Sequence, residues 1–153
     1  MKSLVIALIT VLTLSACSSD DSNAPINYSE QNDADIQAYI TKNNLNATKT
    51  ASGLYYVIDQ QGEGEPPKTN SDVTVAYKGY FLNGTVFDQS DAEGISLNLQ
   101  RVIAGWTEGI TYFNEGGRGM LLVPAHLGYG SYKYGNIPGG SVLIFDIELI
   151  AVN

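Results

Sequence analysis

The stretch DVTVAYKGYFLNGTVFDQS, residues 72–90, decides the fold class of this sequence. Apolar side chains alternate with more polar ones along its first half, at Val73, Val75 and Tyr77. This period of two is typical of a strand with one buried face. Asn83-Gly84 interrupts the pattern before apolar residues resume. Because an Asn-Gly pair favours the tight turns between antiparallel strands, residues 72–90 predict a β-hairpin.

Four further segments read as strands on either side of this hairpin. Gly53–Pro67 begins as a strand and runs into a loop rich in glycine and proline. Residues 95–99 show a short apolar alternation. Residues 120–123 form an apolar run that stops at Pro124, because proline cannot donate a ladder hydrogen bond. The last predicted strand covers Ser141–Val152.

Two segments have the spacing of amphipathic helices. In RVIAGWTEGITYF, residues 101–113, apolar residues recur at steps of three, four and three, at Ile103, Trp106, Ile110 and Phe113. A second short helix is predicted for Ser29–Asn44. Several antiparallel strands and one central helix exclude water only by packing on one another. We therefore predict an α+β fold in which an antiparallel sheet wraps around the short central helix. The extra N-terminal helix lies outside that core.

The first residues predict an export signal. Lys2 precedes an apolar run that is too short for a spanning helix of about 20 residues. LSAC, residues 14–17, resembles the lipobox of bacterial lipoproteins, whose cysteine is lipidated and becomes the first residue after cleavage. We expect a lipoprotein signal peptide over residues 1–16 and a lipidated, flexible tether over residues 17–28, starting at Cys17. The alternative is an ordinary signal followed by a free cysteine.

This signal also predicts a location. A lipidated cysteine would anchor the protein in the cell envelope, and the outer membrane is the expected site. The sequence leaves open whether the domain faces the periplasm or the cell surface.

The composition excludes several classes of function. The chain has 153 residues, enough for one domain and some processing sequence, and a formal net charge of −8. That acidity argues against nucleic-acid binding, which needs clustered Lys and Arg. The single histidine, His126, and a cysteine expected to carry lipid do not make a metal site. No metal, other cofactor or hydrolytic nucleophile is therefore expected. Glu108 and Glu115 are interpreted as solvated charges rather than as an acid/base pair.

The remaining candidates for a functional site are aromatic residues on predicted strands and loops. They are Tyr77, Phe87, Trp106, Tyr129, Tyr132, Tyr134 and Phe145. Part of this set must form the core. An apolar bowl with Trp106 as its floor and a few polar groups on its rim would suit a peptide side chain such as proline.

Four motifs match one family in their order along the chain: VAYKGYFLNGTVFDQS, VIAGWTEGI, PAHLGYG and LIFDIELI. Together they resemble the FKBP-type peptidyl-prolyl cis-trans isomerases, from about Gly53 to the end of the chain. The resemblance implies an antiparallel half-barrel sheet around a short helix, with a hydrophobic pocket for a proline ring. It also implies an isomerase domain over residues 53–153, preceded by an N-terminal helical extension over residues 29–52.

The resemblance implies a set of site residues by motif position. The catalytic set is Tyr77, Phe87, Asp88, Ile103, Trp106 and Tyr129, and the substrate-binding set is Ile95, Val102, Ile137 and Phe145. The Ile103 backbone N–H would donate to a substrate carbonyl, Trp106 would form the floor, and the Tyr129 hydroxyl would reach the bound peptide. Two features depart from the family. Ile95 or Leu97 stands where an aromatic residue is common, and the GSYKYGNIPGG loop is individual, so the preferred peptide is left open.

The expected activity is isomerisation of X-Pro bonds in exported or envelope proteins. Rotation about such a bond loses amide resonance, against a barrier of about 18–20 kcal/mol, and no covalent bond is made or broken. An apolar cavity that strips water from the amide favours the less dipolar, twisted state. Acids, bases and metals are therefore not needed.

The implied partners are proline-containing polypeptides and, through the N-terminal lipid, a membrane. The protein itself is expected to be a monomer. One alternative is a non-catalytic peptide-binding or chaperone module of the same fold. Another is a structural envelope protein that uses its acidic surface for contacts.

Overall fold

The computed structural model describes residues 26–153. The predicted signal peptide over residues 1–16, Cys17 and most of the predicted tether lie outside the described residues. Among residues 26–153, no helix combines the length and the apolar character needed to span a membrane. The helices and strands are α1 (Ser29–Asn43), β1 (Thr48–Lys49), β2 (Tyr55–Gln60), β3 (Asp72–Phe81), β4 (Val86–Gln89), β5 (Ile95–Asn98), α2 (Ala104–Gly109), β6 (Arg118–Val123) and β7 (Leu143–Val152). Short 3₁₀ helices follow β5, α2 and β6, at Leu99–Arg101, Ile110–Tyr112 and Ala125–Leu127.

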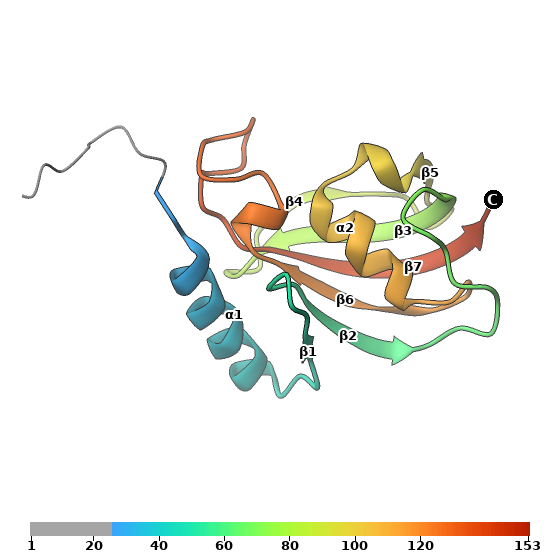
Figure 1. Ribbon diagram of the computed structural model, residues 1–153, viewed down its shortest axis with the longest axis horizontal. Helices are drawn as coiled ribbons and strands as arrows, with labels where there is room; N and C mark the ends of the chain where they lie inside the picture. Colours follow the sequence, from blue (N-terminus) through green and yellow to red (C-terminus); the bar gives the residue numbers. More distant parts are fainter. Residues whose placement is uncertain (1–25) are drawn as a thin grey trace, which may run out of the picture.

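The strands of the described residues form one antiparallel sheet, with the order β1-β2-β6-β7-β3-β4. β3 pairs with β7 along nearly its whole length. β4 and β5 pair with opposite ends of β3, along its other edge. Figure 1 shows α2 lying across one face of this sheet. The predicted α+β fold, a sheet wrapped around a short central helix, is confirmed.

The predicted hairpin is confirmed as β3 and β4. In its turn the Asn83 side chain accepts a hydrogen bond from the Thr85 N–H at 2.9 Å, and the Gly84 N–H donates to the Phe81 carbonyl at 2.8 Å. The last strand begins two residues later than predicted. The Ser141 hydroxyl donates to the Pro138 carbonyl at 2.7 Å, so this part of the chain forms a turn before β7 starts.

The predicted central helix is present but shorter than its sequence pattern. α2 ends at Gly109, and the next turn tightens to a 3₁₀ helix. Glycine is a poor helix former, which favours an end at this point. The apolar face nevertheless behaves as predicted, since Ile110 and Phe113 are fully buried and Trp106 is only 5% exposed. They pack in one cluster with inward side chains of β3, β6 and β7, namely Val73, Val75, Leu121, Val123, Leu143, Phe145, Ile147 and Leu149.

Two glycines let α2 lie close to β6. A Cβ atom at Gly105 would lie 2.6 Å from Val123 Cγ1, and one at Gly109 would lie 2.7 Å from both Leu121 Cδ atoms. These separations are far below van der Waals contact, so a larger residue would push the helix away from the sheet. The position of the helix therefore depends on these glycines as well as on its apolar face.

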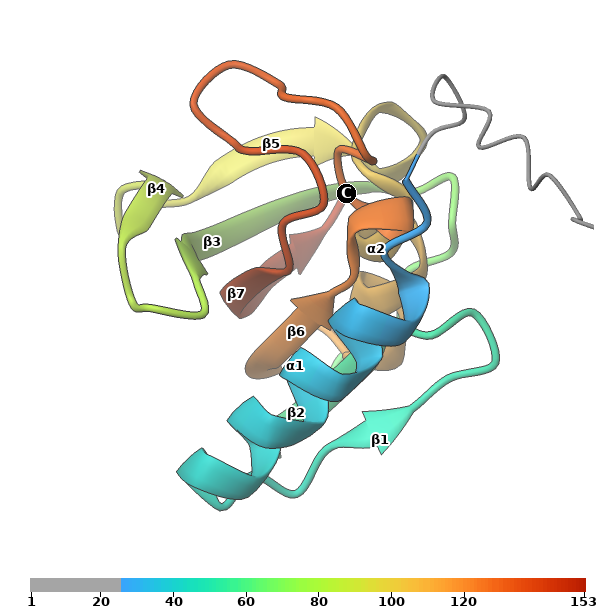
Figure 2. The ribbon, with the colours of Figure 1, turned by 90° about the vertical axis from the view of Figure 1, so that its left-hand side faces the viewer.

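α1 covers the opposite face of the sheet, at β2 and β6. Side chains alternate along β6: Leu121 and Val123 belong to the α2 cluster, whereas Leu122 packs in a second cluster with Ile36 of α1. Ile36 has no exposed surface. Figure 2 shows α1 in front of these two strands. The N-terminal helix thus lies outside the α2 core, as predicted, and packs on the domain itself.

A polar contact also connects α1 to the first strands. Asp33 pairs with Lys49 and accepts a hydrogen bond from the Tyr55 hydroxyl at 2.8 Å. The hydrogen bond from Lys49, and then that from Tyr55, lowers the pKa of the Asp33 carboxyl below its ordinary value. The contact therefore stabilises the fold at neutral pH, and this contribution is lost as the pH falls through the lowered pKa.

Gly105→Ala should destabilise the protein, although alanine is the better helix former. Alanine gains about 1 kcal/mol of helix propensity, but overpacking against the stiff Val123 side chain costs about 1–3 kcal/mol. We expect a net loss of about 1 kcal/mol in the free energy of unfolding, measured by denaturant titration. In a Val123→Ala background the same substitution should be neutral or stabilising. An equal loss in both backgrounds would contradict the close-packing argument.

Candidate functional site

An aromatic cavity lies where α2, the β3–β4 hairpin, β5 and the loop after β6 meet. It has a volume of about 370 Å³. Its lining residues are Tyr77, Phe87, Asp88, Ile95, Leu97, Arg101, Val102, Ile103, Trp106, Tyr129, Tyr134 and Phe145. Nine of the ten site residues predicted within the domain are in this lining. The tenth, Ile137, is not.

A larger hollow of about 830 Å³ adjoins the aromatic cavity and shares Leu97, Arg101 and Val102 with it. The rest of its lining is polar and contains no aromatic side chain. Binding sites for small apolar groups are concave and mostly apolar, with few polar groups. The aromatic cavity is therefore the candidate site.

The floor of the cavity is Trp106. Its indole meets the Tyr77 ring edge-to-face, with 4.9 Å between ring centroids and 83° between ring planes. It meets Phe145 in the same way, at 5.2 Å and 81°. The indole Nε1 is buried and has no hydrogen-bond partner among the described residues. Trp106 therefore offers the cavity apolar surface and no accessible donor.

Aromatic rings from β4 and β7 form one wall. Phe87 meets Phe145 edge-to-face at 5.6 Å, and Phe81 supports Phe87 from behind at 5.0 Å without lining the cavity. The sheet register brings the two strands together here, because Gly79 of β3 pairs with Asp88 on one side and with Phe145 on the other. Edge-to-face pairs add about 0.5–1.5 kcal/mol each beyond burial, so this wall is held firmly.

One side-chain hydrogen bond lies at the rim. The Tyr77 hydroxyl donates to Asp88 Oδ2 at 2.6 Å. Burial, followed by this hydrogen bond, raises the pKa of the Tyr77 hydroxyl above its ordinary value. Tyr77 therefore stays protonated as a donor across the physiological range, and Asp88 is held at the rim as the acceptor.

The start of α2 supplies a backbone donor. Ile103 is the residue before the helix, with φ −60° and ψ 148°, and its carbonyl accepts from the Trp106 and Thr107 N–H groups at 2.9 and 3.1 Å. The Ile103 N–H donates to no other described residue. Helix starts leave such N–H groups unpaired. Since Ile103 lines the cavity, this N–H is available to a ligand carbonyl.

The loop after β6 forms the opposite wall. The Tyr129 and Tyr134 rings stack at 4.6 Å between centroids, with 11° between their planes. Burial, and then the neighbouring Tyr134, raises the pKa of Tyr129. Ile137 is buried and joins Tyr134 through two backbone hydrogen bonds of 2.9 and 2.8 Å. It therefore supports the loop, and its neighbour Tyr134 lines the cavity.

Three lining residues were not in the predicted site. Leu97 lies two residues from Ile95 on the short strand β5; the sequence offered either residue for this wall, and both line the cavity. Tyr134 belonged to the aromatic set, but only the loop conformation places it beside Tyr129. For Arg101 the sequence contains no signal.

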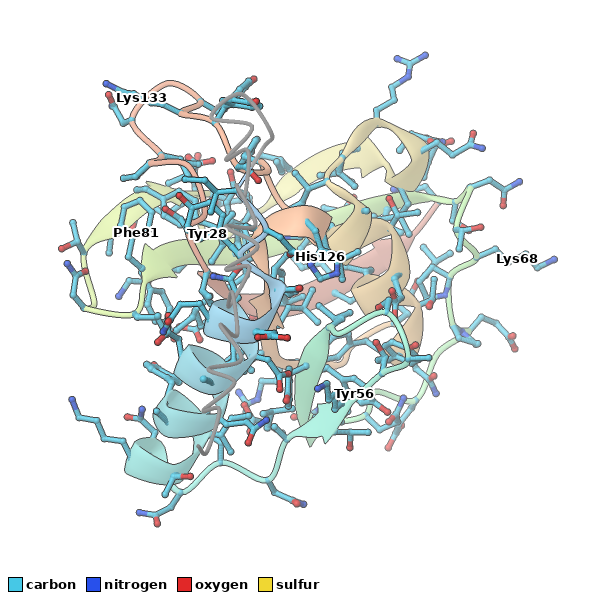
Figure 3. The ribbon with its side chains drawn as sticks, turned by 60° about the vertical axis from the view of Figure 1, so that its left-hand side comes forward. Tyr28, Tyr56, Lys68, Phe81, His126 and Lys133 are labelled. Carbon is cyan, nitrogen blue, oxygen red and sulfur yellow. The ribbon has the colours of Figure 1, made fainter. Side chains whose placement is uncertain are left out.

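Residues interpreted as non-catalytic make contacts elsewhere. His126 lies beside the first turn of α1 (Figure 3), with its Nε2 2.8 Å from the Ser52 carbonyl oxygen. Glu108 accepts from the Ser52 hydroxyl at 2.7 Å, and Glu115 accepts from the Val152 N–H at 2.8 Å. Within residues 26–153, no three His, Cys, Asp or Glu side chains are grouped so that they could hold a metal ion.

Comparison with known proteins identifies relatives of this chain. Residues 63–150 match the family model for FKBP-type peptidyl-prolyl cis-trans isomerases. The chain is 52% identical over 108 residues to the FKBP-type peptidyl-prolyl cis-trans isomerase FkpA of Buchnera aphidicola subsp. Schizaphis graminum, with 69% of this chain and 43% of that protein covered. It is 43% identical over 107 residues to FkpA of Escherichia coli K12, with 68% and 40% covered. The chain thus spans less than half the length of these relatives.

Solved structures have the same fold. The crystal structure of FkpA from Escherichia coli superposes with a TM-score of 0.73 at 35% identity, covering 82% of this chain and 61% of that chain. A peptidyl-prolyl cis-trans isomerase from Pseudomonas syringae pv. tomato superposes with a TM-score of 0.73 at 29% identity, covering 82% and 93%. The described sheet and helix arrangement is therefore FKBP-like.

The raised pKa of Tyr77 predicts that this residue contributes little to the phenolate absorbance of the protein in an alkaline titration. At about pH 11 an ordinary tyrosine is mostly ionised. Because its pKa is raised, Tyr77 should be ionised to a smaller extent at that pH, and Tyr77→Phe should remove less phenolate absorbance than the loss of an ordinary tyrosine would. Asp88→Asn removes the nearby negative charge, so in that variant Tyr77 should ionise at a lower pH. Loss of a full tyrosine's signal from Tyr77→Phe at about pH 11 would contradict the assignment.

Proposed function

The chain belongs to the FKBP-type peptidyl-prolyl cis-trans isomerase family, and we propose that it catalyses cis-trans isomerisation of X-Pro bonds in exported or envelope polypeptides. The aromatic cavity is the observation that carries this proposal. It combines an indole floor, phenylalanine walls, a rim hydrogen bond between Tyr77 and Asp88, and a backbone donor at Ile103. These groups suit a bond rotation, which needs no acid, base or metal.

The cavity would act on the amide by removing water from it. A planar X-Pro amide is strongly dipolar and is stabilised by hydration, whereas the twisted amide has lost conjugation and is less dipolar. Exchanging water for aromatic surface therefore raises the free energy of the planar state relative to that of the twisted state. A thousandfold acceleration needs a difference of only about 4 kcal/mol.

The polar groups would hold one side of the bond while the other turns. The Ile103 N–H and the Tyr129 hydroxyl, which belong to two residues of the cavity lining, would bind peptide carbonyls. The proline ring would sit over Trp106, between the phenylalanine wall and the tyrosine wall. The Tyr77–Asp88 hydrogen bond keeps the Tyr77 ring against the indole, so the floor does not move during the rotation. Positioning of this kind favours the transition state without forming any bond.

Phe87→Leu should lower isomerase activity because it removes ring surface from the cavity wall. We expect kcat/KM for a protein substrate whose refolding is limited by proline isomerisation to fall about tenfold, which corresponds to about 1.4 kcal/mol of lost transition-state stabilisation. The measurement is the rate of proline-limited refolding of a protein substrate. Phe81→Leu is the matched control: it changes the same ring cluster outside the cavity and should keep most of the activity.

The same assay distinguishes an isomerase from a non-catalytic protein of the same fold. In one outcome, the wild-type protein binds proline peptides and still leaves the slow refolding phase unchanged. This result would contradict isomerase activity and favour a non-catalytic binding or chaperone module. Equal losses from Phe81→Leu and Phe87→Leu would show that the ring cluster acts through stability and not through the cavity. An acidic structural protein would be insensitive to both substitutions.

We further propose that the protein is a lipoprotein of the cell envelope, anchored through Cys17 and held as a monomer at the outer membrane. The proposal is supported by the LSAC motif and by the polar residues that follow it. Its partners would be proline-containing polypeptides, together with the membrane that receives the lipid. The net charge of −8 argues against nucleic-acid binding.

Cys17→Ala should abolish lipidation. We expect cells expressing the wild-type protein to incorporate a fatty-acid analogue into it and to retain it in the membrane fraction. The Cys17→Ala variant should lose both the label and the membrane retention, whereas Ser18→Ala should keep both. Unlabelled wild-type protein would contradict lipidation and favour an ordinary export signal.

A further inference from the structure

Residues 26–32 contact the loop between β6 and β7 and the chain just before it. We call residues 128–142 the pocket loop, because Tyr129 and Tyr134 within it line the aromatic cavity. Hydrogen bonds inside the loop join the Gly140 N–H to the Gly130 carbonyl at 2.9 Å and pair Tyr134 with Ile137. These bonds set the shape of the loop. Its orientation relative to the cavity depends on contacts with the rest of the protein.

Asn32 of α1 bridges the chain just before the pocket loop and the far end of the loop. Its Oδ1 accepts a hydrogen bond from the Ala125 N–H at 2.8 Å, where the chain approaches the loop. Its Nδ2 donates to the Gly140 carbonyl at 2.9 Å, near the point where the chain leaves the loop. The Asn32 side chain is 3% exposed, so water does not compete for these bonds. Buried polar groups that lose their partners are costly, and both bonds therefore constrain the loop.

Two further contacts join the same segment to the loop. The Tyr28 ring packs directly on Gly140, which has a φ of +76°; a Cβ atom there would lie 2.5 Å from the ring. The Ser131 hydroxyl donates to the Ile26 carbonyl at 2.7 Å. Figure 3 shows Tyr28 at the beginning of α1, near the loop that carries Lys133. Residues 26–32 thus contact the pocket loop near both of its ends.

We infer that Asn32 is a positioning residue for the aromatic cavity: with residues 26–32 it holds the pocket loop so that Tyr129 and Tyr134 line the site. This inference rests on the proposed isomerase function. Asn32 itself does not line the cavity and acts only through the loop. The N-terminal extension is therefore part of the substrate-binding apparatus and not only a spacer before the domain.

The inference predicts a particular change in kinetics. If the loop is released, a smaller fraction of molecules presents both tyrosines to the peptide, and the apparent affinity falls by that fraction. Once a peptide is bound, the rest of the cavity is unchanged. KM should therefore rise while kcat changes little.

The decisive variant is Asn32→Leu, which keeps the size of the side chain and removes both hydrogen bonds. We expect KM for a proline peptide to rise about fivefold with kcat within about twofold of wild type. Trp106 is the only tryptophan of the chain, so its fluorescence reports directly on the cavity floor. Quenching of this fluorescence by acrylamide should increase in the variant, because the loop that covers one side of the cavity is less ordered.

Two controls separate positioning from loss of stability. Gln37→Leu makes the same chemical change on α1, where the amide bonds only to Asp33 at 2.7 Å and is exposed, and it should leave KM and quenching unchanged. Val57→Ala weakens the second cluster under α1, to which Val142 at the end of the pocket loop also belongs, but it keeps the Asn32 and Ser131 hydrogen bonds, and it too should leave both unchanged in the folded protein. A KM for Val57→Ala as high as that for Asn32→Leu would overturn the inference.

The inference is also overturned if folded Asn32→Leu has the KM and the quenching of wild type. Should Asn32→Leu fail to fold, the double variant Tyr28→Ala/Ser131→Ala decides the question, because it removes the other two contacts without leaving a buried polar group unpaired. It should raise KM and quenching in the same direction, and wild-type values would refute the role of the segment.

Failure of the proposed function gives a different result. In that case the wild-type protein has no isomerase activity, but the quenching measurement needs none. If quenching increases in Asn32→Leu and not in the control variants, the result still supports loop positioning in an inactive protein. Unchanged quenching would refute it whether or not the protein is an enzyme.

Discussion

The packing of Trp106 between α2 and the sheet holds the central helix in place and shapes the cavity beside it. α2 has six residues and would not be stable on its own, so the burial of its apolar face holds it in place. Gly105 lets the helix approach β6, and the indole then meets Tyr77 and Phe145 edge-to-face. The contacts that hold the helix also form the cavity floor. Stability and the proposed function therefore coincide at Trp106.

Helices pack on both faces of the sheet, with α2 over β3, β6 and β7 and α1 over β2 and β6. α2 packs on one face and leaves the aromatic cavity open beside its first residue. β4 and β5, which pair with opposite ends of β3, both contribute side chains to this cavity. α1 packs on the other face through Ile36. From there Asn32 reaches the pocket loop, so the wall of the cavity is held by an element that does not border it. The two layers are coupled through this loop.

Much of the fold and of the candidate site could be predicted because the signals are local. The alternation at Val73, Val75 and Tyr77 and the Asn83-Gly84 turn specify the hairpin whatever surrounds it. Motif order then located nine of the twelve lining residues, and Leu97, Arg101 and Tyr134 were outside the predicted set. Ile137 and Tyr134 lie three residues apart, and only the bridge between them decides that the isoleucine is buried and the tyrosine borders the cavity.

The strands other than β1, the apolar face of α2 and the aromatic character of the site follow from the sequence, because periodicity and side-chain chemistry are properties of short segments. The packing of the elements decides which rings border the cavity and which, like Phe81 and Phe113, belong to the core cluster without lining it. It alone also connected Asn32 with Ala125 and Gly140, which lie 93 and 108 positions further along the chain. Contacts across such distances arise from the packing of whole elements, and no local pattern encodes them.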